Sequence, residues 1–427
     1  MQYPSRFRLL AVFLLALGLM TGAVAHAESA ALTTLYAFTG SEGANPFSGL
    51  VQGADGALYG TAYQGGVNNT GTIFKIAPSG ALSVLYTFSA ASWDPTAQAN
   101  INADGCNPLG LIQGADGDFY GVTPCGGLGG SGTVFKITPD GTLKTLHTFS
   151  VLDPYSQCNS DGAHPYAGLV QGADGDLYGT THDGGVQGYG TIFRITPRGG
   201  FDRLHSFSAL DFNGINKDGA NPAASLALGA DGNLYGTTYW GGAYGNGTVF
   251  RISPTRTFTL LYAFSAFTST NSSGYGINAE GANPSAGLAP ADDGGFYGAA
   301  FYGGAAGFGS LFKITPDGVL TTLYSFSRRY GAGPDSLIRG VDGNLYGTAC
   351  QGGYKSDGTV FCLTPDGSMS LLHAFSANRE NTAGTTWYNR DGCRPSGLIQ
   401  GADGSLYGTT YSGGAGGMGT IFHLKAR

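Results

Sequence analysis

Residues 49–88 read GLVQGADGALYGTAYQGGVNNTGTIFKIAPSGALSVLYTF, and the chain writes this pattern seven times. Each copy contains Leu-Tyr-Gly or Phe-Tyr-Gly, an Asp-Gly pair whose Asp lies four residues before the tyrosine, and a glycine twelve residues after it. The seven tyrosines are Tyr59, Tyr120, Tyr178, Tyr235, Tyr297, Tyr346 and Tyr407. The intervals are identical in every copy, so each copy is one structural unit.

Short runs of alternating apolar and polar residues fill each copy, and Gly, Pro, Asp and Asn bound them. Such runs are typical of β-strands joined by tight turns. The first copy predicts four strands, A to D, at residues 47–52, 57–63, 72–77 and 82–88. Asp-Gly between A and B suits a tight hairpin turn. Each unit is therefore expected to be a four-stranded antiparallel sheet.

Only one connection varies in length, and it leads from strand D to the next strand A. The Phe that ends strand D is followed by the next repeat Asp after 16 residues at Phe326 but after 29 residues at Phe264. Seven small antiparallel sheets predict an all-β, seven-bladed β-propeller of four-stranded blades. A β-solenoid has shorter coils, and tandem β-sandwiches need about 100 residues each.

The two ends of the repeat array predict how the ring closes. Residues 32–38, LTTLYAF, have the pattern of a D strand but precede the first A strand. The last copy ends with its C strand, residues 420–425, and has no D strand of its own. We expect residues 32–38 to pair beside residues 420–425 and complete the last blade, which closes a very long loop without a covalent bond.

The N-terminal leader indicates where the protein is located, and the net charge limits which partners it can bind. Residues 1–27 contain two arginines, an apolar run and an Ala-His-Ala site, which predicts a signal peptide. Residues 28–427 are then a single propeller domain, secreted or periplasmic, with no membrane span after cleavage. The formal net charge of −7 offers no basic field for a phosphate backbone, so we expect no nucleic-acid partner. We also expect a monomer without a cofactor.

One copy carries a family resemblance. Residues 174–199 read DGDLYGTTHDGGVQGYGTIFRITPRG. This resembles DGxLYGTTxxGGxxGxGTxFxIxPDG, the unit of a bacterial family of secreted GloVer-type tandem-repeat proteins. The resemblance extends over residues 32–425, and it ends PRG where the pattern has PDG. It implies an extracellular β-propeller repeat array and supplies no catalytic residues.

The B-to-C and D-to-A connections share one face of an antiparallel blade ring, which we call the variable-loop face. This face is the default binding surface. Aromatic and polar residues recur on it where strand B ends, and they suit a glycan because rings stack on sugars while polar groups bind hydroxyls. The predicted ligand-binding residues are Tyr63, His182, Asp183, Tyr239, Trp240, Tyr302 and Tyr411. The alternative is that these aromatics only pack between blades.

A second cluster lies in the third copy, where His164 opens strand A and His182 closes strand B. Antiparallel pairing brings them near each other, with Asp161 and Asp183 in reach. Such a group could hold a divalent metal or supply an acid and a base. The favoured interpretation is a solvated loop in which Asp161 caps its own turn and His164 replaces the usual Asn. We expect a non-enzymatic binding module with no metal. The alternatives are a lyase or hydrolase that uses His164, His182 and Asp183, and a structural or adhesive envelope protein.

The six cysteines fit an oxidising compartment. One disulfide is expected between adjacent strands of the second blade and another across the boundary of the sixth and seventh blades. The cysteines concerned are Cys106 with Cys125 and Cys350 with Cys393. Cys158 is an alternative partner for Cys125, and Cys362 is expected to be unpaired.

Two further recurrent features are interpreted as structural. His147, His205 and His373 replace a tyrosine at one fixed position of strand D. An acidic residue, such as Asp161, precedes strand A in six copies. One carboxylate per copy is too few for calcium, which needs six to eight oxygens, so we expect these residues to support turns.

Overall fold

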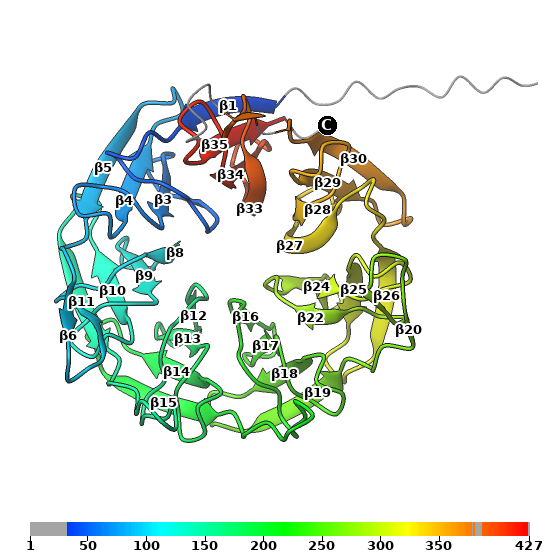
Figure 1. The fold of residues 1–427 in the computed structure, drawn as a ribbon, viewed down its shortest axis with the longest axis horizontal. Coiled ribbons are helices and arrows are strands. Elements are labelled where there is room, and N and C mark those ends of the chain that lie inside the picture. The colour runs from blue at the N-terminus through cyan, green and yellow to red at the C-terminus, as the bar shows by residue number, and fades with distance from the viewer. Residues whose placement is uncertain (1–31, 378, 381–386, 426–427) are drawn as a thin grey trace, which may run out of the picture.

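The computed structural model describes residues 32–377, 379–380 and 387–425. Seven antiparallel sheets stand around a central axis in this part of the chain (Figure 1), which confirms the all-β, seven-bladed propeller. No helix among the described residues is long and apolar enough to cross a membrane. The predicted signal peptide, residues 1–27, lies outside the described residues.

In the first six blades the strands run outward from the axis in chain order, with strand A innermost (Figure 1). The strands of blades one to three are β2 (Val51–Gln52), β3 (Leu58–Ala62), β4 (Thr72–Ile76), β5 (Leu82–Thr87); β8 (Leu109–Gln113), β9 (Phe119–Thr123), β10 (Thr133–Ile137), β11 (Leu143–Thr148); and β12 (Val170–Gln171), β13 (Leu177–Thr181), β14 (Thr191–Ile195), β15 (Phe201–Ser206).

Blades four to six follow the same plan, except that strand A of blade five is divided in two. Their strands are β16 (Ala227–Leu228), β17 (Leu234–Thr238), β18 (Thr248–Ile252), β19 (Phe258–Ala263); β22 (Ala282–Pro284) with β23 (Ala289–Pro290), β24 (Phe296–Tyr302), β25 (Ser310–Ile314), β26 (Leu320–Ser325); and β27 (Ala332–Arg339), β28 (Leu345–Gln351), β29 (Thr359–Leu363), β30 (Met369–Ala374).

Three hairpins lie in the variable D-to-A connections. They are β6 (Ser92–Asp94) with β7 (Ala99–Ile101), β20 (Ser269–Thr270) with β21 (Gly276–Ile277), and β31 (Arg379–Glu380) with β32 (Trp387–Tyr388). The long connections are therefore partly ordered by their own pairing, and they vary without disturbing the blades.

The seventh blade joins the two ends of the array. It contains β33 (Cys393–Gln400), β34 (Leu406–Ser412), β35 (Thr420–Leu424) and β1 (Leu32–Ala37). Strand β1 is antiparallel to β35, with a register from Leu32 opposite Leu424 to Ala37 opposite Thr420. The predicted closure is confirmed.

The hydrophobic core lies between neighbouring blades. Each strand D is followed directly by a fully buried phenylalanine, and its ring packs against a phenylalanine of strand C in the next blade. The Phe149 and Phe193 ring centroids, for example, are 5.6 Å apart. Phe38 makes the equivalent contact from blade seven to Phe74 of blade one, at 5.3 Å. Apolar burial thus stabilises the ring as a whole rather than separate blades.

The repeated Asp and Tyr fix the A-to-B turn, on the face opposite the variable loops. Asp55 accepts hydrogen bonds from the Ala57 amide at 3.1 Å and from the Tyr59 hydroxyl at 2.9 Å. Lys75 of β4 completes the group with an ion pair to Asp55 at 2.7 Å. The Tyr-to-Asp bond recurs at Tyr120, Tyr178, Tyr235, Tyr346 and Tyr407. The most regular residues of the repeat are therefore structural.

The recurrent Asn-Pro at the start of strand A fastens each blade to the one before it. Asn283 donates from its backbone amide to the Asn246 carbonyl and from its side-chain Nδ2 to the Tyr239 carbonyl, both at 2.8 Å. We call this pair of bonds the blade staple. The side-chain bond also forms at Asn45, Asn107 and Asn221. Other residues occupy the position in the remaining blades, namely His164, Gly333 and Arg394.

Strand A is shorter than expected in several blades. Residues 47–52 were predicted, but β2 covers only Val51–Gln52. In blades one, three, four and five, the last residue of strand A comes six residues after the recurrent proline, whereas the interval is five in the other three blades, for example from Pro395 to Gln400. The additional residue interrupts the ladder, as a bulge does.

The acidic residues before strand A bind strand D of the preceding blade. Asp161 Oδ2 lies 3.0 Å from His147 Nε2, and the carboxylate also accepts from the Ser150 amide. The same pairing joins His205 to Asp218 and His373 to Asp391. These histidines are structural, as expected. The carboxylates brace strand D rather than only their own turns.

Candidate functional site

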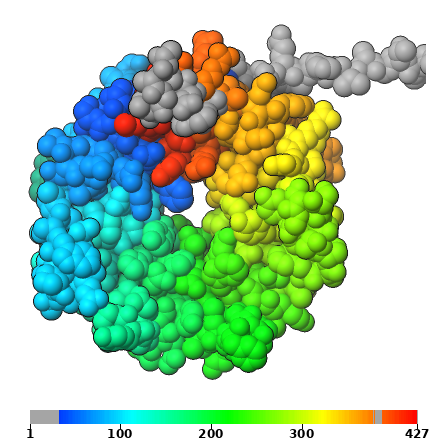
Figure 2. Space-filling view, viewed as in Figure 1, coloured from blue at the N-terminus to red at the C-terminus, as the bar shows by residue number. Residues whose placement is uncertain are grey.

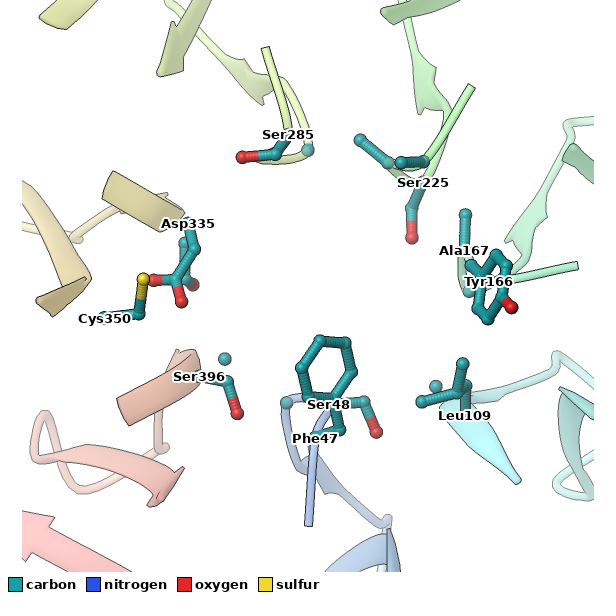
Figure 3. Close-up of a pocket in the computed structure, with 18 of the residues that line it drawn as sticks. Phe47, Ser48, Leu109, Tyr166, Ala167, Ser225, Ser285, Asp335, Cys350 and Ser396 are labelled. Carbon is teal, nitrogen blue, oxygen red and sulfur yellow. The ribbon is translucent and has the colours of Figure 1, made fainter. Parts of the chain in front are cut away.

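A cavity of about 1110 Å³ lies at the centre of the ring, and all seven blades contribute to its wall. Its lining comes from residues at or just before the start of the A strands and from residues at or just after the end of the B strands. Those ends belong to the variable-loop face. Figure 2 shows the opening at the middle of the molecule, and Figure 3 shows the residues that surround it.

Four of the predicted ligand-binding residues share one position, where strand B ends, and line this cavity. They are Tyr63, His182, Tyr239 and Tyr411. Phe47 and Tyr166, which directly follow the recurrent proline before strand A in blades one and three, join them from the inner edge. Phe47 packs edge-on against Tyr411, with ring centroids 5.7 Å apart. Aromatic rings from several blades therefore face one shared space.

Burial, together with the neighbouring Tyr302, raises the pKa of Tyr239 to about 12. The Tyr239 hydroxyl therefore stays protonated at neutral pH and remains a hydrogen-bond donor.

Trp240 and Tyr302 occupy the next position along strand B, and the structure separates them. Trp240 lines the cavity with 45 % of its surface exposed, and its ring packs edge-on against Tyr239 at 5.0 Å. Tyr302 is not among the described lining residues, and its ring stacks at 6.5 Å on Tyr275 in the β20–β21 hairpin.

The histidine cluster of blade three forms around one carboxylate. His164 Nδ1 lies 2.9 Å from Asp183 Oδ2, and His182 Nδ1 lies 2.8 Å from Asp183 Oδ1. Asn221 of the next blade donates to the same carboxylate at 3.2 Å. Burial opposes ionisation of Asp183, but the two histidines outweigh it and hold its pKa well below the usual range.

The Asp183 carboxylate only accepts hydrogen bonds, so each imidazole presents a protonated Nδ1 to it. His182 also lines the cavity, where its ring packs edge-on against Tyr166 at 5.4 Å. The fourth predicted member, Asp161, is bound to His147 elsewhere. No group of three or more His, Cys, Asp or Glu side chains suited to a metal occurs in the described part of the chain.

The sequence reasoning missed Asp335, which opens strand A of blade six on β27. Its side chain lines the cavity, and its Oδ1 accepts a hydrogen bond from the Thr348 hydroxyl at 2.8 Å. Burial raises the pKa of Asp335 to about 8, so the carboxyl is mostly protonated at neutral pH. A signal was available, because Asp335 is the only charged residue that directly follows the recurrent proline. The seven residues at that position are Phe47, Leu109, Tyr166, Ala223, Ser285, Asp335 and Ser396.

Cys350 lies next to Asp335 in the cavity wall (Figure 3). Burial and the Asp335 charge raise the pKa of the Cys350 thiol, and the Arg394 charge acts in the opposite direction. Arg394 was also missed. It is exposed, and it is the one Lys or Arg among the described lining residues. Its signal was Cys-Arg-Pro in place of the usual Asn-Pro.

Of the two predicted disulfides, only Cys106–Cys125 forms. The Cys350–Cys393 pairing is wrong. Cys393 lies opposite Ser412 in the register of its own blade, and its Sγ is 3.0 Å from the Ser412 hydroxyl. Cys350 ends strand B one position earlier in the repeat than Cys125 and Ser412 do, so its side chain turns to the cavity instead.

Fold and site together define a β-propeller with an aromatic central cavity. The chain belongs to the Gloeobacter/Verrucomicrobia repeat family, whose model matches residues 25–214, 155–277 and 216–386. This match confirms the resemblance to GloVer-type repeat proteins. No curated protein matches the sequence.

Solved structures share the architecture. A streptogramin B lyase is 17 % identical with a TM-score of 0.56, over 93 % of this chain and 98 % of that one. A virginiamycin B lyase from Staphylococcus aureus is 14 % identical with a TM-score of 0.55, over 93 % of this chain and 99 % of that one. At such identities the likeness establishes the propeller fold alone.

Proposed function

We propose that this chain is an exported binding protein that holds a glycan in its central cavity. The observation that carries the proposal is that aromatic residues at the ends of strand B line the cavity, although Tyr63 also packs against the core between blades. Phe47 and Trp240 remain 52 % and 45 % exposed there. Flat rings left accessible in a concave wall suit the apolar faces of sugar rings.

Polar groups interleave with the rings. Ser285 is part of the cavity wall, and its hydroxyl oxygen is buried without a hydrogen-bond partner among the described residues. The Asp335 carboxyl and the Gln351 side chain lie in the same wall. Sugar hydroxyls both donate and accept, so they would satisfy such groups. Export is supported by the leader pattern of residues 1–27 and by the Cys106–Cys125 disulfide.

The test is a glycan array followed by calorimetry on the glycans that bind. Trp240→Ala and Tyr63→Ala should each weaken binding about tenfold, which is the scale of one lost aromatic contact. Tyr155→Ala is the matched control, because Tyr155 is 95 % exposed on a variable connection and is not part of the cavity lining. This control should bind as the unaltered protein does.

Two results would overturn the cavity site. One is that no glycan binds at all, which would favour the structural or adhesive role. The other is that Tyr155→Ala loses binding while Trp240→Ala and Tyr63→Ala keep it, which would move the site to the loops.

The second candidate function is a lyase or hydrolase, and the His164–Asp183–His182 cluster favours it. Asp183 orients His182 beside the cavity, which is how an acid or base is held for proton transfer. Both structural neighbours described above are lyases. If the chain cleaves a glycan that it binds, His182→Gln should abolish turnover and retain binding. Intact glycan after prolonged incubation would exclude this candidate for that ligand.

A further inference from the structure

The charges that face the central cavity differ from those of the whole chain. The formal net charge of the chain is −7. The described cavity lining contains one guanidinium, Arg394, one carboxyl, Asp335, and one imidazole, His182. Asp335 is mostly protonated at neutral pH, and the ionised Asp183 lies behind His182 in blade three, so the wall formed by blades six and seven is positive within an acidic protein. This part of the wall attracts an anion that the rest of the surface repels.

Arg394 occupies a position where the fold favours asparagine. Its backbone φ is +52°, in the left-handed region that Asn tolerates better than Arg. The Arg394 amide still donates to the Asp357 carbonyl at 2.9 Å, as the staple requires. The Arg394 side chain, however, is exposed in the cavity wall. It does not form the hydrogen bond that the Asn283 side-chain amide donates to the Tyr239 carbonyl. An unfavourable backbone conformation retained for a cavity-facing charge points to a role in binding.

Asp335 and Arg394 act on the same side of the cavity. Arg394 holds the staple position of blade seven, and the staple side chain of other blades reaches the residue equivalent to Cys350, as Asn283 reaches the Tyr239 carbonyl. Figure 3 shows Asp335 and Cys350 together in one part of the wall. Thr348 donates to Asp335 Oδ1 and thereby fixes the carboxyl. A protonated carboxyl and a guanidinium are both hydrogen-bond donors, and together they match one carboxylate.

We propose that the cavity selects glycans that carry a carboxylate, with Arg394 and Asp335 as the groups that bind it. The sugar ring then packs on the aromatic side chains of the wall, and the acid group faces blades six and seven. The proposed ligand class is therefore uronic acid oligosaccharides. This inference rests on the proposed function, because it adds a charge requirement to the same glycan site.

Matched acid and ester ligands separate charge from shape. The probes are oligogalacturonate and oligomannuronate, each beside its methyl ester, which keeps the ring and removes the charge. In calorimetry near neutral pH, the protein should bind at least one acid about tenfold more tightly than its ester. The preference should shrink with added salt, which screens the ion pair and not the ring contacts.

Two variants test the named residues with substitutions that the repeat itself supplies. Arg394→Asn restores the residue of four other blades, so the fold should be kept, and it should bring acid and ester to within about twofold of each other. Asp335→Ser introduces the residue of blades five and seven and should reduce the preference several-fold. Trp240→Ala should weaken acid and ester alike. Melting temperatures of all variants show that they are folded.

Each outcome decides a separate point. Equal binding of acid and ester by the unaltered protein overturns the charge selection and leaves glycan binding intact. An unchanged preference in Arg394→Asn overturns the role of Arg394. If neither acid nor ester binds, this inference fails. The proposed function fails with it only when the neutral glycans of the array are also not bound.

Discussion

Single residues that depart from the repeat mark the candidate site. The asparagine of the staple is replaced three times, and each replacement has a distinct consequence. His164 turns to Asp183, and Arg394 faces the cavity. Gly333 leaves space for the Phe301 ring, since a Cβ there would come within 2.6 Å of it. A position released from a structural bond becomes available for binding.

Asp335 should make stability depend on pH. Its pKa is raised from 3.8 to about 8 in the folded chain, so folded protein holds a proton that unfolded protein has released. That stabilising contribution is complete below about pH 4 and is lost as the pH rises to about 8. Asp335→Ser lacks the titrating group. Its stability should therefore improve relative to the unaltered protein as the pH rises through this window.

Urea unfolding at about pH 5, 7 and 9 measures this difference. Asp335→Asn, which is similar in shape and does not titrate, should follow the same pH trend as Asp335→Ser. A difference in stability that stays constant over the three pH values would contradict a buried, protonated carboxyl. The titratable and charged neighbours in the wall are Cys350 and Arg394, and neither is changed in these variants.

At the scale of elements, strand A places the charged groups. In blades six and seven it is a long strand, and its pairing begins at Ala332 opposite Gln351 and at Cys393 opposite Ser412. Asp335 lies on β27 at a register shift between Pro334 and Ser336, and Arg394 lies on β33 between the paired residues Cys393 and Pro395. In blade one, where β2 has two residues, Phe47 lies before the strand. The two long strands thus bear the polar part of the site, and Asp335 occupies a bulge in the first of them.

The staple predicts a cost for losing one blade junction. Asn283 is 3 % exposed and has a φ of +56°. Asn283→Ala removes the bond to the Tyr239 carbonyl and strains the backbone, so the free energy of unfolding should fall by about 2–4 kcal/mol. Asn283→Gly removes the bond but tolerates the φ, and it should cost about 1–2 kcal/mol.

Chemical denaturation of both variants measures the two costs separately. Equal losses in Asn283→Ala and Asn283→Gly would show that the left-handed backbone carries no strain. No loss in either would show that the side-chain bond does not stabilise the junction between blades four and five.

At the scale of the whole molecule, the ring depends on closure. A blade buries its phenylalanine only against the next blade, so an open array would leave one apolar face exposed to solvent at each of its two ends. Closure is reinforced by side-chain bonds between blades one and seven. Gln52 accepts from the Ala402 amide at 2.8 Å, and Asn45 donates to the Tyr411 carbonyl at 2.9 Å.

Phe38 and Phe149 separate closure from ordinary packing, because both are fully buried at the same repeat position. Replacing either with alanine should cost about 3–5 kcal/mol, the usual price of a large cavity. Only Phe38→Ala should also speed amide exchange in β1 and β35, since it lies where the chain ends meet. Hydrogen exchange of the two variants checks this. If amide exchange in β1 and β35 is the same in Phe38→Ala as in Phe149→Ala, the closing blade is no weaker than the others.

The repeat intervals determined the propeller from the sequence alone. Fixed spacing within each copy reflects local turns and ladders, and these depend on residues close together in the chain. The closure by residues 32–38 followed from the same pattern, as did the Cys106–Cys125 pair, whose partners lie on adjacent strands. The positions at the ends of strand B were also predictable as a shared face, because every copy has the same interval from its repeat tyrosine to that position.

Only the tertiary structure decided which of those side chains meet. Trp240 and Tyr302 share a repeat position, yet one lines the cavity and the other stacks on Tyr275 in a loop. Asp335 and Cys350 lie on paired strands of one blade, but Arg394 belongs to the next copy and joins them only because the ring sets blade seven beside blade six. The residue pattern within one copy determines the strands and turns of its blade. Contacts between blades depend on the packing angles of the blades, which no single copy encodes.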